Sequence, residues 1–478
     1  MKADFSYSPV TESTINDLVG IFGESGVSVD REKIEAYSKD EVAPHLWDKK
    51  YSAEVVCFAE CTEQISELMK YASIHRIPVT PRGAGTGLSG GAVPAFKGIE
   101  LSLERMNRIL EFDRNNLTIT VEPGVVTAEI NKAAIDNHLM YAGDPCSGDA
   151  SFIGGNVAEN AGGNKVVKYG ATGSHVLGME VVLPDGSVTW FGGKRRKDVT
   201  GYDFVHLIVG SEGTLGVVTK IILRLLPLPS FVVDLLVPFP DIRTAIASVP
   251  EVMTRGKAIP SSIEFMDKRS MVLTGKYLNT SFPFMDEAEA HVILQYEGDD
   301  REHLADEIEK IGDICMECGA LEVFVADNRT TRDKLWKGRK SVAEAVWAFA
   351  PIQLANEDLV VPTGAISEFM SGLDDICRSH NVDYAAYGHL GDGNMHVTIY
   401  IEKENPQWRE IIGRACSDLY RLVKKLGGTL TGEHGVGLKR VKHIPFFLDE
   451  PQIDLIRRVK LAFDPNNILN PGKIVPWN

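Results

Sequence analysis

The amino-acid sequence predicts an α+β fold built from more than one domain. Short apolar runs such as "AEVVCFA" and "HVILQYEG" alternate with amphipathic segments such as "CTEQISELMKYASIHR", which is the pattern of mixed sheet and helix. The 478 residues exceed what one hydrophobic core usually serves, so two or three domains are expected. The 44 glycines gather in clusters, which indicates backbone in left-handed or close-approach conformations.

Changes of composition divide the chain into four parts. Residues 1–50 are polar with helical patches and predict a helical N-terminal segment. Residues 51–228 open with a β-α-β unit and contain a hairpin turn at Pro184–Ser187. Two prolines end this part, and residues 229–405 alternate β runs with helices as a second α+β domain. Residues 406–478 are mostly helical, and we expect them to pack back on the domain formed by 51–228.

Charge and composition exclude several classes of function. The net charge of −16 argues against a nucleic-acid partner, because phosphate binding needs clustered Lys and Arg. No run of eighteen apolar residues occurs, so no membrane span is expected. The first ten residues lack the apolar core of a signal peptide, and the seven cysteines are scattered. We therefore expect a cytoplasmic protein.

The stretch "RGAGTGLSGGAVP", Arg82–Pro94, holds five glycines and fits the spacing G-x-G-x-x-G from Gly85. A Rossmann fingerprint needs a helix directly after the glycines, whereas Pro94 blocks the first turn and no helical periodicity follows. Consecutive N–H groups in a bent loop can instead bind an anion. We expect a pyrophosphate cradle aided by Arg82 and Thr86, with a purely structural glycine turn as the alternative.

Two more glycine-rich stretches follow in the same domain. They span Gly143–Gly170 and Ile208–Ile221 and contain small residues throughout. Small residues let the main chain approach a flat ligand closely. Three such loops in one domain predict a single large nucleotide ligand.

Candidate catalytic residues lie in two later stretches. In "YGHLGDGNMHVTIYI", His389 and His396 flank the turn that ends at Asn394, so both can face one point across a hairpin. In "GGTLTGEHGVGLKR", Glu433 lies beside His434. Two histidines and a carboxylate form a divalent-metal set that leaves positions open for substrate. A single histidine of this kind would more often be a core or surface residue.

These stretches resemble the FAD-linked 2-hydroxyacid dehydrogenases of the vanillyl-alcohol oxidase / p-cresol methylhydroxylase superfamily, over roughly residues 40–475. The resemblance implies the two-part FAD-binding domain of that superfamily, a substrate (cap) domain and a helical C-terminal segment. It implies FAD-binding roles for Arg82, Gly83, Ala84, Gly85, Thr86, Gly87, Pro145, Ser151, Gly154, Gly155, Asn156, Ala161, Gly162, Gly163, Tyr169, Gly170, Glu212, Gly213 and Val218.

The resemblance also implies the chemistry of the other candidates. It makes His389, His396 and Glu433 ligands of a divalent metal, zinc first, with iron or manganese as alternatives. It makes His434 the catalytic base and Asn394 an active-site polar residue. Arg339, in the helical stretch "KLWKGRKSVAEAV", would bind the substrate carboxylate, for which a guanidinium is well matched. An exposed helix arginine is the alternative.

One departure from the family bears on the substrate. The 2-hydroxyglutarate branch has a threonine where this chain has Ala343, and a basic residue where it has Asn356. A second carboxylate would lack its anchors, which favours D-lactate, then glycolate, over D-2-hydroxyglutarate. We expect electrons to pass to an electron-transfer flavoprotein, an iron–sulfur subunit, a cytochrome or a quinone. An oxygen-using oxidase and a non-catalytic FAD subunit of a larger complex are the alternatives, and a homodimer is compatible with the sequence.

Overall fold

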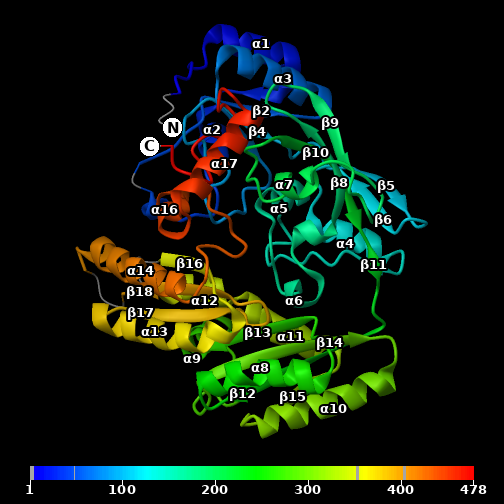
Figure 1. The fold of residues 1–478 in the computed structure, drawn as a ribbon, viewed down its shortest axis with the longest axis vertical. Coiled ribbons are helices and arrows are strands. Elements are labelled where there is room, and N and C mark those ends of the chain that lie inside the picture. The colour runs from blue at the N-terminus through cyan, green and yellow to red at the C-terminus, as the bar shows by residue number, and fades with distance from the viewer. Residues whose placement is uncertain (1–4, 48, 351–354, 402–404, 478) are drawn as a thin grey trace. The chain divides into compact units, whose positions relative to one another are not determined.

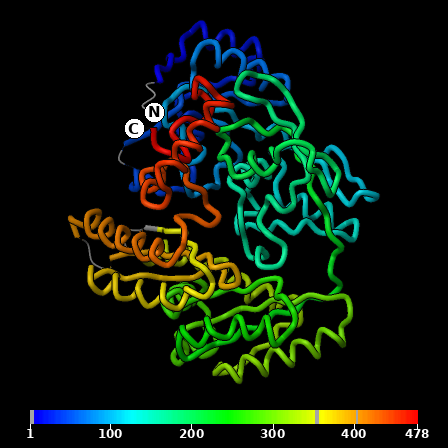
Figure 2. The backbone as a smooth tube through the Cα atoms, in the orientation of Figure 1, coloured from blue at the N-terminus to red at the C-terminus, as the bar shows by residue number. Residues whose placement is uncertain are grey.

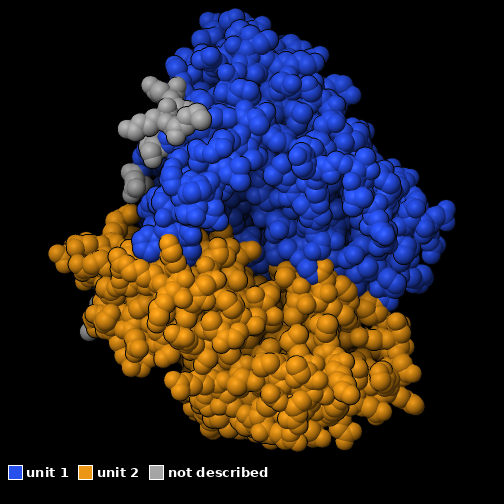
Figure 3. Space-filling view, in the orientation of Figure 1, with its two compact units in different colours: residues 1–162, 170–228, 433–478 blue, residues 163–169, 229–432 orange. Residues whose placement is uncertain are grey.

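The computed structural model describes residues 5–47, 49–350, 355–401 and 405–477 (Figure 1). The chain divides into two compact units. Unit 1 comprises 1–162, 170–228 and 433–478, and unit 2 comprises 163–169 and 229–432 (Figure 3). Both units combine helices with sheets, so the predicted α+β class is confirmed.

Unit 1 begins with the predicted β-α-β arrangement. Its four-stranded sheet has the order β1 (Val27–Ser28), β2 (Val55–Phe58), β4 (Ile99–Ser102), β3 (Val79–Arg82), and β4 runs parallel to both β2 and β3. Helix α3 (Thr62–His75) connects β2 to β3. Its apolar residues Ile65, Leu68, Met69 and Ala72 recur at helical spacing and are buried in the core of this sheet.

The second sheet of unit 1 is antiparallel. Its order is β5 (Ile109–Asp113), β6 (Thr118–Val121), β10 (Val217–Arg224), β8 (Val176–Val182), β9 (Val188–Gly192). The predicted hairpin joins β8 to β9, and Leu183 N–H donates to Ser187 O across the turn at 2.8 Å. A two-stranded sheet pairs β7 (Leu139–Met140) with β11 (Leu226–Pro227). The other helices of unit 1 are α1 (Glu12–Phe22), α2 (Arg31–Tyr37), α4 (Thr127–Ile135), α5 (Ile153–Glu159), α7 (Phe204–Ile208), α15 (Gly437–Arg440), α16 (Ile444–Phe447) and α17 (Glu450–Phe463).

The C-terminal part of unit 1 is tied to the strand and loop that carry the first glycine cluster. Figure 2 shows this red segment running among the blue elements of the same unit. Val79 N–H donates to Ile468 O, and Asn470 N–H donates to Val79 O, both at 2.8 Å. The Lys473 ammonium donates to Gly90 O and Val93 O at 2.7 and 2.6 Å. The last forty-odd residues are therefore part of unit 1.

Unit 2 is a seven-stranded antiparallel sheet with helices on both faces. The strand order is β15 (Phe324–Ala326), β12 (Phe231–Phe239), β14 (Ala290–Gly298), β13 (Ser262–Asp267), β17 (Asp383–His389), β18 (Asn394–Tyr400), β16 (Ala355–Val360). Helices α9 (Lys268–Leu278), α11 (Arg329–Lys340) and α12 (Val342–Phe349) share a core with the face that bears Tyr387. Helix α14 (Trp408–Lys425) covers the opposite face, where Tyr420 donates to Glu357. Helices α8 (Ile242–Gly256), α10 (Arg301–Glu317) and α13 (Ile366–His380) complete the unit.

The boundaries between the two units fall at unexpected positions in the chain at two places. Residues 163–169, which include α6 (Val166–Tyr169), belong to unit 2, where Tyr169 and Lys168 contact the buried carboxylate of Glu297. Residues 229–432 belong to unit 2, and the chain returns to unit 1 at Glu433. Within the described ranges, no helix combines the length and apolar character that crossing a bilayer requires.

Asp267 makes the stability of unit 2 depend on pH. It is buried, its carboxylate accepts N–H groups from Ser270 and Ala386, and burial raises its pKa to about 6. An unfolded aspartate has a pKa of about 3.9, so between about pH 4 and 6 only the folded state holds this proton. Its contribution to stability therefore falls as pH rises through this window, by roughly 3 kcal/mol. We expect the deficit in melting temperature of Asp267→Asn to shrink between pH 4.5 and 7.

A matched control is Asp241→Asn. Asp241 caps α8 as Asp267 caps α9, but the hydrogen bonds from Thr244 lower its pKa. It stays ionised across the same window, so the deficit of its variant should not shrink. Thermal melts of both variants at four pH values decide the matter, and a constant deficit for Asp267→Asn would refute the assignment.

Candidate functional site

A large cleft lies within unit 1 and is lined by all three glycine-rich loops. The space between its walls, with the open mouth included, is about 1360 Å³. All the predicted cofactor residues except Gly163, Tyr169 and Gly170 line it. The cleft therefore has the glycine-rich lining expected for a dinucleotide site.

No helix forms between Arg82 and the start of β4 at Ile99, a stretch the structure describes in full. This confirms that the G-x-G-x-x-G match is not a Rossmann fingerprint. Gly85 has φ +78°, and a Cβ there would lie 1.9 Å from a guanidinium nitrogen of Arg82. Arg82 is buried beneath the loop and donates to Lys39 O at 2.6 Å. The Arg82 side chain thus supports the loop. The main chain of the loop is left to line the cleft.

Several residues that line the cleft lie in the predicted glycine-rich stretches but were not named individually from the sequence. They come from the segments between the predicted positions and include Cys146, Ser147, Phe152, Glu159, Ser211 and Val217. Cys146 and Ser147 lie next to Pro145, and Ser211 precedes Glu212, so proximity to the glycine clusters was a usable signal. Glu159 ends α5 and is partly buried. Burial raises its pKa well above the usual range of a glutamate.

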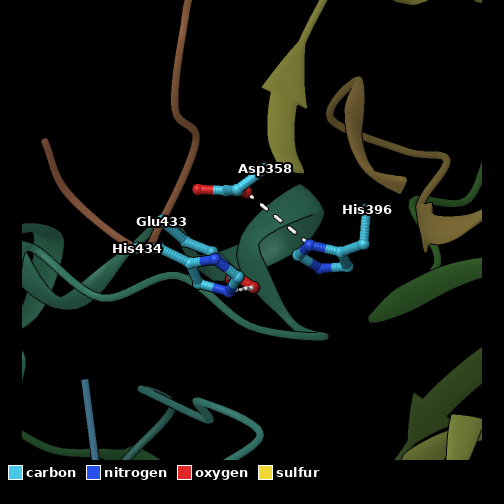
Figure 4. A group of neighbouring side chains, drawn as sticks. All are labelled: Asp358, His396, Glu433 and His434. Carbon is cyan, nitrogen blue, oxygen red and sulfur yellow. Dashed lines mark ion pairs between the residues drawn. The ribbon is translucent and has the colours of Figure 1, made fainter. Parts of the chain in front are cut away.

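Glu433 and His434 also line this cleft from the C-terminal part of unit 1. Their side chains approach each other, with Glu433 Oε1 at 3.7 Å from His434 Nε2 (Figure 4). A Cβ on Gly162 would lie 2.7 Å from Glu433 Oε2, so the second glycine cluster leaves room for that carboxylate. The predicted base and one predicted metal ligand are therefore placed at the nucleotide cleft.

The remaining candidates gather on one face of the unit 2 sheet. Directly opposite residues of antiparallel strands share a face. Glu264 on β13 pairs with His389 on β17, and His389 pairs with Asn394 on β18. Tyr387 lies two residues before His389, so it shares this face. It pairs with His396, which in turn pairs with Asp358 on β16. The rings of His389 and His396 are 5.4 Å apart, centroid to centroid.

Glu264 is the buried centre of this face. Its Oε1 lies 2.8 Å from His389 Nδ1, and its Oε2 lies 2.7 Å from Arg339 Nη2. The guanidinium also lies over the Tyr387 ring, 5.1 Å from its centroid. Burial alone would raise the pKa of Glu264, but His389 and Arg339 outweigh it and hold that pKa below its usual range. Glu264 is therefore ionised at neutral pH, and it favours the His389 tautomer with the proton on Nδ1.

Asp358 plays a similar part at the other end of the face. It accepts from Asn394 Nδ2 at 2.7 Å, from Thr431 Oγ1 at 2.6 Å and from Gly432 N–H at 3.0 Å. Its Oδ1 lies 3.7 Å from His396 Nδ1, the ion pair drawn in Figure 4. Asp358 thus fixes residues 431–432, which lead directly into Glu433.

Sequence reasoning did not single out Glu264 or Asp358. The signal was present, because each is an acidic residue inside an apolar strand, "SIEFMD" and "NEDLVV". Buried charges in strands are rare unless paired. Their partners lie 125 and 73 residues away in the chain, so the pairing itself could not be read locally.

Comparison with known proteins identifies the family. Residues 53–192 match the model described as FAD binding domain, and residues 228–474 match that of the FAD linked oxidases, C-terminal domain. The chain belongs to the FAD-linked oxidase family. This confirms the resemblance drawn from the sequence and makes the protein an FAD-dependent oxidoreductase.

Three relatives illustrate the branch. The chain is 38% identical to the glycolate oxidase subunit GlcD of Bacillus subtilis (strain 168), over 86% of this chain and 87% of the relative. It is 34% identical to a D-lactate dehydrogenase of Anaerostipes hadrus, over 99% of both. It is 30% identical to a D-2-hydroxyglutarate dehydrogenase of Stutzerimonas stutzeri (strain A1501), over 96% of this chain and 98% of the relative.

Solved structures agree on the fold. A substrate-bound p-cresol methylhydroxylase superposes with a TM-score of 0.80 at 17% identity, covering 98% of both chains. A 4-ethylphenol oxidase from Gulosibacter chungangensis superposes with a TM-score of 0.76 at 21% identity, covering 97% of both chains. The predicted p-cresol methylhydroxylase type of fold is therefore confirmed.

The cleft fits FAD on a further observation. A Cβ at Gly155, which lines the cleft, would meet no atom within 4 Å. Any side chain at that position would project into open space that the cofactor needs.

We expect Gly85→Ala to lower the affinity for FAD at least tenfold. The added Cβ would collide with the Arg82 guanidinium, and alanine is strained at φ +78°. The bound-flavin to protein ratio after gel filtration measures the effect. Gly20→Ala is the control, because Gly20 lies in α1 and its Cβ would meet nothing within 4 Å. An unchanged flavin content in Gly85→Ala would contradict this view of the loop.

Proposed function

We propose that the protein oxidises a small D-2-hydroxyacid, D-lactate first and glycolate next, to the 2-oxoacid. The named relatives are glycolate oxidase subunits, D-lactate dehydrogenases and a D-2-hydroxyglutarate dehydrogenase. The observation that carries the proposal is the polar face of unit 2, where His389, His396 and Arg339 are held by buried carboxylates. Such a face suits a substrate that presents a hydroxyl and a carboxylate side by side.

A divalent metal would be held by His389, His396 and Glu433. Imidazole and carboxylate ligands suit zinc, with iron or manganese as alternatives. Each histidine has a buried carboxylate near Nδ1, at 2.8 Å for His389 and 3.7 Å for His396. Metal-binding histidines commonly direct their other nitrogen to a carboxylate in this way. When bound, the metal supplies a positive charge that acidifies the substrate hydroxyl.

Arg339 would orient the substrate through its carboxylate. A guanidinium carries five N–H donors, so an Arg339 that binds Glu264 can engage a second carboxylate as well. The side-chain amide of Asn394 donates to Asp358, and this hydrogen bond fixes the orientation of Asn394 on the same face. The substrate would thus be held by a charge at one end and a fixed polar group at the other.

His434 would take the hydroxyl proton. It lines the FAD cleft beside Glu433, and an imidazole can act as a general base near neutral pH. When bound, the flavin supplies the redox chemistry by accepting the α-hydrogen as hydride. The substrate then loses one proton and one hydride, and the 2-oxoacid remains.

The preference for a monocarboxylate rests on Asn356. It lies two residues before Asp358 on β16, so it belongs to the same polar face. A neutral amide at this position offers no ion pair to a second carboxylate. Ala343, on α12, offers no hydroxyl.

Electrons must then leave the flavin. The sequence contains neither a Rossmann fingerprint nor a cysteine set for an iron–sulfur cluster. We therefore infer an external acceptor, either an electron-transfer flavoprotein, an iron–sulfur subunit or a cytochrome, or a quinone.

Anaerobic stopped-flow mixing tests the substrate directly. We expect D-lactate and glycolate to bleach the visible flavin band of the FAD-loaded, metal-loaded protein, with L-lactate and D-2-hydroxyglutarate at least tenfold slower. Asn356→Lys should narrow the gap between D-lactate and D-2-hydroxyglutarate. Fastest reduction by D-2-hydroxyglutarate in the wild type would refute the monocarboxylate preference, and bleaching by none of the four would refute the proposed activity.

Glu264→Gln tests the metal-binding face. An amide cannot match the carboxylate that orients His389, so we expect metal affinity to fall about 10–100-fold. Competition with a metal-sensitive dye measures this without turnover. Glu357→Gln is the control, because Glu357 is also buried in the sheet but faces Tyr420 on the other side. Equal affinity in the two variants would contradict a role for Glu264 in metal binding.

A further inference from the structure

The turn that follows Glu433 and His434 is held by a carboxylate from a distant part of unit 1. Val436 N–H donates to Glu212 Oε1 and Gly437 N–H donates to Glu212 Oε2, each at 2.7 Å. Both oxygens of Glu212 are thus engaged by the main chain, and its side chain is buried.

The backbone at Glu212 indicates that this side chain is specifically needed. Its φ is +51°, a left-handed conformation that is unfavourable for a residue other than glycine. The conformation is fixed by donation from Glu212 N–H to Ala158 O at 2.7 Å and from Asn470 Nδ2 to Glu212 O at 2.8 Å. A glycine would fit this backbone more easily, but it would offer no carboxylate to the turn.

Three further features restrict the same turn. Gly435 has φ +82°, and a Cβ there would lie 1.9 Å from Glu159 Oε2 and 3.2 Å from Glu212 Oε1. Gly435 O accepts from the buried Arg440 at 3.1 Å. A Cβ on Gly437 would lie 2.2 Å from Ser89 O, in the first glycine loop. The turn therefore has little freedom to move while Glu212 holds its N–H groups.

We propose that Glu212 is a positioning residue for the reaction, because its two hydrogen bonds to the 436–437 main chain set the places of His434 and Glu433. This inference rests on the proposed function for its catalytic consequence, but the clamp itself does not. The family resemblance implied an FAD-binding role for Glu212. Its backbone lines the cleft, while its carboxylate binds the turn.

Glu212→Gln tests the clamp. Glutamine keeps one acceptor but turns an NH₂ group toward the second N–H, so at least one hydrogen bond is lost. Hydrogen–deuterium exchange of the holoenzyme should show the Val436 and Gly437 amides exchanging at least tenfold faster, with strands elsewhere in unit 1 unchanged. Exchange equal to that of wild type would overturn the proposal.

Activity measurements test the consequence. A misplacement of the base by about 1 Å is worth roughly 10²-fold in rate, so kcat with D-lactate should fall by about that factor. KM should change less than fivefold and the flavin content should stay stoichiometric. Glu180→Gln is the control: Glu180 is a buried carboxylate on β8 that binds Thr62 and Thr219, outside the cleft. A fall in kcat matched by this control, or explained by lost flavin, would overturn the positioning role.

Gly435→Ala perturbs the same turn directly, within the turn itself. The new Cβ would push the turn off Glu159 while leaving both carboxylates in the chain. It should reproduce the fast amide exchange and the lower kcat even if Glu212→Gln does not fold, and wild-type values for both would overturn the proposal. Should the wild type oxidise none of the hydroxyacids while both variants show fast exchange, the proposed function fails and the clamp stands.

Discussion

The Glu264 carboxylate, buried between Arg339 and His389, is the interaction on which the rest of the unit 2 face depends. A charge inside a protein must be paired, and removing one partner of a buried pair costs about 3–5 kcal/mol. Each of these residues comes from a different element, namely β13, α11 and β17. The pairing therefore fixes one helix and two strands together, and it also determines which nitrogen of His389 faces away from the sheet.

Unit 1 differs from unit 2, because it must hold a large ligand with main chain rather than with side chains. Glycines at Gly85, Gly155 and Gly162 leave room for Arg82, for the ligand and for Glu433, respectively. Buried charged groups, among them Arg82 and Lys473, support these loops from within the unit. Arg82 and Lys473 lower the pKa of the buried Glu100 against the larger effect of burial, which raises it. Carboxylates and cations below the surface thus hold loops whose exposed side is backbone.

Much of the fold and part of the site could be predicted from local sequence. Pro94 sufficed to exclude a Rossmann helix, and Gly391–Asn394 sufficed to place His389 and His396 on a hairpin. Local patterns could not reveal Glu264, Asp358 or the Glu212 carboxylate, because their partners lie far away in the chain. The roles given to Gly163 and Tyr169 depended on their place in a glycine cluster, yet residues 163–169 pack with unit 2 through Glu297. Hydrophobic periodicity predicts helices and strands well, but it says little about which buried charged residues pair with each other.

The central claim is that the histidine–carboxylate face of unit 2 works with a divalent metal on a small 2-hydroxyacid. Its most direct test is anaerobic reduction of the bound flavin by D-lactate before and after the metal is removed with a chelator. We predict that the metal-free protein keeps its FAD but leaves it oxidised, and that added zinc or manganese restores reduction. Full-rate reduction of the metal-free protein would contradict the account.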